Sequence, residues 1–261
     1  MAFEIRGAVA VVTGASSGLG RQFALDLAAG GAVVVGIARR EELLTQLAQE
    51  MQRTSPKSSV MVCDVSDTTR FATALAAIEH EHERIDVLIN NAGIGEPREE
   101  GDGRGISSYR LVMETNYFAT VAGTLAVLPG MLGRRRGVVV NVSSDTGRAP
   151  SPNEAAYAAS KAAVSAFTES VSFDTETKGV HLHVLYPGWV PTAMGAGAVD
   201  SGMPEPPRMV RRTPEQVSRL LLARMGGTKV DINAAPIAVL APVARALFPG
   251  GYRKGVRKAS G

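Results

Sequence analysis

The sequence of 261 residues is poor in cysteine, in aromatic residues and in histidine. Its one cysteine, Cys63, has no partner for an intramolecular disulfide. A glycine-rich motif begins as early as Gly14, so we expect no signal peptide in front of it. These absences favour a reducing compartment, and we expect a cytoplasmic protein.

Long unbroken apolar runs are also missing. Residues 115–133 and 179–199 carry no Asp, Glu, Lys or Arg. However, Asn116 and the Pro129-Gly130 pair interrupt the first stretch, and Pro187 and Pro191 interrupt the second. A spanning helix needs roughly 20 predominantly apolar residues, so we expect no membrane span.

The chain has little excess charge of either sign. The formal net charge is only +3, and four positive charges lie in the basic C-terminal tail, about 249–261. A nearly neutral body argues against a nucleic-acid groove. For the tail itself, weak peripheral contact with an anionic membrane surface is an alternative, although Pro236 and Pro242 interrupt the helical pattern before it.

What the sequence does contain is an alternation of two patterns. Short Val- and Ile-rich runs predict buried strands, and amphipathic stretches such as 41–53 and 67–84 predict helices between them. The alternation predicts an α/β fold with a single doubly wound, Rossmann-like parallel sheet and helices on both faces. We expect one domain over residues 1–261. The predicted strands are 8–13, 32–38, 59–63, 85–90, 138–142 and 180–186.

The pattern changes after Thr192. Residues 193–212 are rich in Gly, Ala, Pro and Met, and they predict a mobile substrate loop. A final helix is expected over 214–225, because Thr213 can cap it, Pro214 suits its first turn and Gly226 can end it.

A glycine-rich turn follows the first predicted strand directly and leads into a helix. Glycines at 14, 18 and 20 allow the backbone to turn tightly and approach a diphosphate. The positive end of the helix dipole favours the negative charge of that group. The turn therefore predicts a dinucleotide site, to which we assign Gly14, Ser16, Ser17, Gly18, Leu19 and Gly20.

The spacing Gly-x-x-x-Gly-x-Gly resembles the short-chain dehydrogenase/reductase family, and the resemblance continues in order up to about Thr192. Residues 90–93 match the family's Asn-Asn-Ala-Gly motif, and Asn116 stands where the family has a functional asparagine. The family's serine matches within 141–144, its Tyr-x-x-x-Lys motif matches 157–161, and its Pro-Gly-x-Val-x-Thr motif matches 187–192.

The resemblance implies four catalytic residues. Tyr157 would be the general acid and base, and Ser144 would hydrogen-bond the substrate oxygen. Lys161 would hold the nicotinamide ribose, and Asn116 would anchor a water molecule that links Lys161 to solvent. An ammonium four residues from a phenol shares its helix face, so we expect Lys161, with the oxidised nicotinamide, to lower the pKa of Tyr157.

The end of the second strand indicates the type of cofactor. NAD-dependent folds place an acidic residue there, but this chain has Ala38 followed by Arg39 and Arg40. Guanidinium groups suit the 2′-phosphate of NADP, so NADP is favoured and NAD is less favoured. By resemblance, Asp64 contacts the adenine amino group, while a helix cap is the alternative.

The remaining cofactor contacts follow from the same resemblance, and Tyr157 and Lys161 belong to both sets. His181 and His183 form a His-x-His pair without an acidic or cysteine partner, so we assign no metal site. The other expected cofactor residues are Val65, Asn91, Ala92, Gly93, Pro187, Gly188, Val190 and Thr192.

The leading hypothesis is an NADP(H)-dependent oxidoreductase that interconverts a secondary alcohol and a ketone by hydride transfer. A β-ketoacyl thioester is an alternative substrate. A catalytically idle NADP(H)-binding sensor or scaffold is the alternative from another class. We expect a small-molecule partner and a homo-oligomer, either dimer or tetramer.

Overall fold

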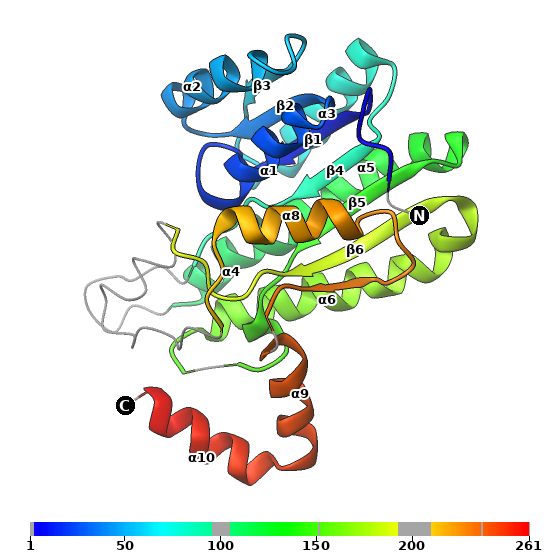
Figure 1. Cartoon of the computed structure of the whole chain (residues 1–261). Helices are drawn as coiled ribbons and strands as arrows, with labels where there is room; N and C mark the ends of the chain where they lie inside the picture. The colour runs from blue at the N-terminus through cyan, green and yellow to red at the C-terminus, as the bar shows by residue number, and fades with distance from the viewer. Residues whose placement is uncertain (1–2, 96–104, 151, 193–209, 236, 261) are drawn as a thin grey trace.

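A seven-stranded parallel sheet forms the centre of the protein, here described from a computed structural model (Figure 1). The structure describes residues 3–95, 105–150, 152–192, 210–235 and 237–260. The strand order is β3-β2-β1-β4-β5-β6-β7, so the predicted doubly wound fold is confirmed. The strands are β1 (Val9–Thr13), β2 (Val33–Ala38), β3 (Ser59–Val62), β4 (Val87–Asn90), β5 (Gly137–Val142), β6 (Val180–Tyr186) and β7 (Asp231–Asn233).

Helices cover both faces of this sheet. One face packs against α1 (Gly18–Ala29), α2 (Glu41–Gln52) and α8 (Pro214–Arg224). The other packs against α3 (Thr68–His82), α5 (Ala119–Arg134) and α6 (Ala155–Thr175). Each face has its own apolar cluster, which explains why the strands are rich in Val and Ile throughout.

The chain reverses its winding direction between β1 and β4, which are neighbours in the sheet. Loops that follow two such strands leave in opposite directions and open a crevice at their carboxyl ends. The glycine-rich turn after β1 and the Asn-Asn-Ala-Gly segment after β4 meet at this point. The fold therefore brings the predicted motifs to one edge of the sheet.

Residues 106–134 form one continuous helical stretch of α4 (Ile106–Met113), a π-helical turn η1 (Glu114–Phe118) and α5. By length and hydropathy it could cross a membrane. However, half of its apolar window is buried in the fold, and Val127, Leu128 and Met131 belong to the core under the sheet. We therefore interpret it as a core helix.

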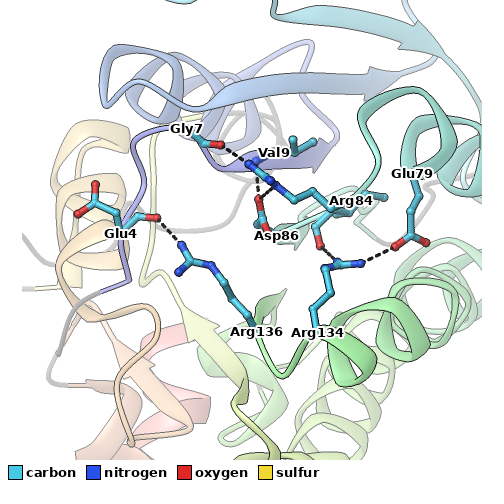
Figure 2. Close-up of polar contacts among 9 residues, drawn as sticks. Glu4, Gly7, Val9, Glu79, Arg84, Asp86, Arg134 and Arg136 are labelled. Atoms are coloured by element: carbon cyan, nitrogen blue, oxygen red, sulfur yellow. Dashed lines mark hydrogen bonds and ion pairs between the residues drawn. The ribbon is translucent and has the colours of Figure 1, made fainter.

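The edge of the sheet opposite the crevice is fastened by ion pairs (Figure 2). The buried carboxylate of Asp86 accepts hydrogen bonds from Arg84 Nε at 2.8 Å and from the backbone N–H of Val9 at 2.9 Å. Arg134 bonds Glu79 at 3.1 Å and the carbonyl of Ile85 at 2.9 Å. Arginines of the run before β5 therefore make contacts within the molecule.

The C-terminal part differs from the sequence-based expectation. Helix α8 begins as predicted, with Thr213 in a capping box with Gln216 and Pro214 in its first turn. It is not the last helix, because β7, α9 (Ile237–Leu247) and α10 (Pro249–Ser260) follow it. Pro242 lies inside α9, and the basic tail is helical in α10. Residues 193–209 of the predicted substrate loop lie outside the described residues.

Candidate active site

A cleft of about 520 Å³ opens at the carboxyl ends of the strands. It has the size of a small-molecule site. Among the sequence-predicted site residues, all but Gly20 and Asn116 line it. Motifs from distant parts of the chain therefore share one cavity.

The glycine-rich turn has the shape that a diphosphate cradle requires. Gly14 and Gly18 have φ values of +66° and +56°, a region that favours glycine. A Cβ atom on Gly20 would lie 2.4 Å from both Asn91 Nδ2 and the carbonyl oxygen of Gly14. Gly20 is thus needed for close packing behind the turn, which explains why it does not line the cleft.

The start of α1 completes this cradle. Ser17 is the N-cap residue, yet within the described chain its side chain caps none of the first N–H groups. Arg40 donates hydrogen bonds to Ser16 Oγ at 2.8 Å and to Ser17 Oγ at 2.7 Å. The Arg40 guanidinium therefore lies over the serines of the turn, beside the positive end of the helix dipole. The Arg40 guanidinium and the N-terminus of α1 together favour binding of an anion at the turn.

Arg39 takes a different position from its neighbour. Its guanidinium lies 3.7 Å from the carboxylate of Asp64, and both side chains are largely exposed. Partial burial alone would raise the pKa of Asp64, but hydrogen bonds from Ser66 and the nearby Arg39 outweigh it and lower that pKa. Asp67, and not Asp64, caps α3. The alternative role of Asp64 as that helix cap is therefore wrong.

The two adjacent serines after β5 make different contacts. The hydroxyl of Ser143 is 2.8 Å from the Lys161 carbonyl and from Ser165 Oγ, so it fastens β5 to α6. Ser144 lines the cleft, where its Oγ accepts hydrogen bonds from Thr146 Oγ1 at 3.0 Å and from the Thr146 N–H at 3.3 Å, and it lies close enough to Tyr157 to lower the pKa of that phenol. The structure thus brings Ser144 and Tyr157 together.

Tyr157 and Lys161 lie near the start of α6 and face the cleft, as their four-residue spacing predicts. In the free protein, burial raises the pKa of Tyr157 to about 12, and the carboxylates of Glu154 and Asp145 add to this effect against the Ser144 hydrogen bond. The free protein shows no lowering of this pKa by Lys161, and the lowering expected with the oxidised nicotinamide bound stays a prediction. A phenol with this pKa stays protonated at neutral pH.

Lys161 is buried close to Tyr157. Its Nζ lies 5.8 Å from the centre of the Tyr157 ring and donates a hydrogen bond to the Val142 carbonyl at 2.8 Å. Burial lowers the pKa of Lys161 to about 8. Desolvation thus disfavours the ammonium form of Lys161, although a lysine with this pKa is still mostly protonated near pH 7.

Asn116 lies behind the cleft, in the π-helical turn. Its Oδ1 accepts a hydrogen bond from the Ile94 N–H at 2.8 Å, and its Nδ2 donates to the Ile94 carbonyl and to Ser160 Oγ, both at 3.0 Å. A Cβ atom on Gly93 would lie 3.1 Å from Asn116 Oδ1 and 3.4 Å from Lys161 Nζ. Asn116 thus joins the loop after β4 to α6 beside Lys161.

Asp145 is a cleft residue that the sequence reasoning missed. It follows Ser144 in the short 3₁₀ turn η2 (Asp145–Gly147). Its Oδ1 is buried and has no hydrogen-bond partner in the part of the chain that the structure describes. Burial raises the pKa of this carboxyl to about 6, although Arg148 opposes the effect. Only its position beside a candidate catalytic serine could have indicated a role.

The Asp145→Asn variant is expected to be more stable than the wild type at neutral pH. Because the folded state raises this pKa from 3.8 to about 6, the fold binds the proton more tightly and loses stability as pH rises through that range. Asparagine removes the charge, so we expect a gain of about 2 kcal/mol near pH 8 and little gain near pH 4. Urea unfolding at both pH values measures it. An equal gain at both pH values would mean that the charge of the buried Asp145 carboxylate is not the cause.

The residues present fit a nicotinamide dinucleotide. The turn and the start of α1 suit its diphosphate, Arg39 and Arg40 suit a phosphate at the adenosine end, and Tyr157 and Lys161 line the same cleft. Asn91 also holds the loop after β4 against β1, since its Nδ2 donates to the Thr13 carbonyl at 3.0 Å.

Comparison with known proteins agrees with this geometry. A family model described as short chain dehydrogenase matches residues 8–201. A dehydrogenase/reductase SDR family member 7B from Bos taurus is 38% identical over 94% of this chain and 79% of its own length. The dehydrogenase/reductase SDR family protein 7-like from Anopheles gambiae is 31% identical over 90% of this chain and 77% of its own length.

Two solved structures share the fold. Levodione reductase has a TM-score of 0.79 and 25% identity, and covers 94% of this chain and 100% of its own. The F189W actinorhodin polyketide ketoreductase with NADPH also has a TM-score of 0.79, with 28% identity over 90% and 98% of the two chains. The family match and the similar proteins show that this chain belongs to the short-chain dehydrogenase family and is an oxidoreductase.

Proposed function

We propose that this chain is an NADP(H)-dependent reductase that interconverts a ketone and a secondary alcohol. The observation that carries the proposal is the meeting of Ser144, Tyr157 and Lys161 in one cleft with an anion cradle and two arginines. NADPH, when bound, supplies the hydride for the carbonyl carbon. The protein supplies orientation and proton transfer.

The roles of the side chains follow from their positions. Ser144 donates a hydrogen bond to the substrate carbonyl oxygen, and Tyr157 protonates that oxygen as negative charge develops on it. The pKa of about 12 keeps Tyr157 protonated in the free protein, so its hydroxyl is available as a proton donor. Lys161 holds the ribose hydroxyls. Asn116 positions the Ile94 backbone next to Lys161, and a water relay through it stays a prediction.

The proposal is tested by NADPH consumption in the presence of a panel of ketones. A β-ketoacyl thioester belongs in the panel, because one similar solved structure is a polyketide ketoreductase. Consumption by the wild type supports an enzyme. Tight NADPH binding without consumption on any member of the panel would favour the sensor or scaffold alternative.

Preference for NADP is expected to depend on Arg39 and Arg40. Loss of a charge-assisted contact to the 2′-phosphate costs about 1.5–3 kcal/mol, so Arg39→Ala and Arg40→Ala are each expected to weaken NADPH binding by about 10- to 150-fold. NADH lacks this phosphate, so its Kd is expected to change little. Fluorescence titration with both cofactors measures the effect, and Arg53→Ala, at the exposed C-terminal end of α2 and outside the cleft lining, serves as control. Equal losses for both cofactors would refute the role.

We also propose a homo-oligomer, in a cytoplasmic setting. Exposed apolar side chains lie at the junction of η1 and α5 and on α6, namely Phe118, Leu125 and Phe173. Such side chains on adjacent helices are typical of a subunit contact. Light scattering of the purified chain measures the mass directly.

A further inference from the structure

The last two helices form a hairpin with little cover from the rest of the molecule. Figure 1 shows α9 and α10 extending away from the sheet, and Arg245 and Tyr252 tie them to the carbonyls of Arg148 and Pro150. Large apolar side chains on α9 and at its end are half to two-thirds exposed: Val239, Leu240, Val243, Leu247 and Phe248. This C-terminal hairpin presents more exposed apolar side chains together than any other described segment.

The exposed side chains of α9 lie on one side of that helix. At 3.6 residues per turn, Val239, Leu240, Val243 and Leu247 fall within an arc of about 100°. Arg245 lies almost opposite this arc, and its Nη1 donates a hydrogen bond to the Arg148 carbonyl at 2.9 Å. The side of α9 that carries Arg245 therefore faces the body, and its apolar arc faces away.

Helix α10 adds positive charge to the same hairpin. Arg253, Lys254 and Arg257 are exposed, and the Tyr252 hydroxyl bonds the Pro150 carbonyl at 3.1 Å on the other side of the helix. From Ile232 to Gly261 the sequence has no Asp or Glu and five Lys or Arg. An apolar arc next to a purely basic helix is the pattern of a segment that lies at the interface of an anionic bilayer.

A second copy of the chain fits this surface less well. In a two-fold symmetric contact the same patch meets itself, so the cations of each α10 would approach those of its partner. Like charges at such short distance oppose association. Anionic lipid headgroups instead complement the charge, and acyl chains accept the apolar arc.

We propose that the α9–α10 hairpin is a membrane-docking element that binds the surface of a bilayer rich in anionic lipid. Apolar side chains of α9 enter the region between headgroups and acyl chains, while Arg and Lys of α10 pair with lipid phosphates and carboxylates. The proposal does not depend on the reaction proposed above.

Vesicle co-sedimentation of the full-length chain tests this. We expect at least ten-fold tighter binding to vesicles of phosphatidylcholine with phosphatidylserine than to phosphatidylcholine alone, and weaker binding at high salt. Leu240→Ser with Leu247→Ser, and separately Arg253→Glu with Lys254→Glu, are each expected to reduce binding at least ten-fold. Val62→Ser, an exposed apolar residue on the edge strand β3, is the matched control and is expected to change nothing.

Urea unfolding and light scattering on the same variants separate the outcomes. Weaker vesicle binding with an unchanged unfolding midpoint supports the proposal. Binding that is equal for both vesicle types, or unaffected by all four substitutions, would overturn it. Absence of vesicle binding together with an oligomer that the two serine substitutions dissociate would also overturn it, in favour of a subunit contact.

Discussion

Replacing Tyr157 with phenylalanine is expected to lower kcat/KM for ketone reduction by about 10²- to 10⁴-fold, the usual contribution of a positioned proton donor. The ring still fits its half-buried site, because only the hydroxyl is removed. NADPH binding is therefore expected to change far less than turnover. Initial rates on a ketone that the wild type reduces, together with an NADPH titration, measure both.

Tyr117→Phe is the matched control for this variant. Tyr117 packs against Phe118 and Phe167 in the helical stretch outside the cleft, so loss of its hydroxyl is expected to leave the rates nearly unchanged. If Tyr157→Phe and the wild type reduced the ketone equally fast, Tyr157 could not be the proton donor.

Lys161→Met is expected to abolish most activity and yet to stabilise the fold. The pKa of Lys161 falls from 10.5 to about 8 through burial, so the unfolded chain binds this proton more tightly. The ionised lysine therefore costs the fold up to about 3 kcal/mol below pH 8. The methionine also leaves the Val142 carbonyl without its donor, so the net gain is expected to be about 1–2 kcal/mol near pH 7.

The dependence on pH identifies the cause of this gain. Stability of the wild type is expected to rise relative to the variant between about pH 8 and the ordinary lysine pKa of 10.5, where both states become neutral. Urea unfolding over this range measures the difference. Lys178→Met, at an exposed position, is expected to show neither effect. A constant difference at every pH would mean that packing, and not charge, is responsible.

Much of the site could be predicted because its chemistry depends on short spacings within single elements. Tyr157 and Lys161 are four residues apart on α6, and Gly14, Gly18 and Gly20 form one turn. Local geometry decides where such residues point. The doubly wound parallel sheet also followed from the alternation of apolar runs and amphipathic helices, since the crossover rules leave few topologies.

The features that were missed depend on tertiary contacts. Nothing in the pair Ser144-Asp145 indicates that the Asp145 carboxylate is buried beside Tyr157 and raises its pKa. β7 is three residues long and is held by pairing with β6, so its sequence carries almost no strand pattern. The two prolines before the tail suggested an interrupted helix, yet Pro242 is accommodated within α9.

Transfer of deuterium from NADPH that carries deuterium at both hydrogen positions of the nicotinamide C4 to a ketone substrate tests the central claim most directly. The account predicts that mass spectrometry finds the label on the carbinol carbon of the product, that NADPH supports this better than NADH, and that Tyr157→Phe nearly abolishes it. Product formed without the label, or tight NADPH binding with no transfer to any ketone or β-ketoacyl thioester, would contradict it.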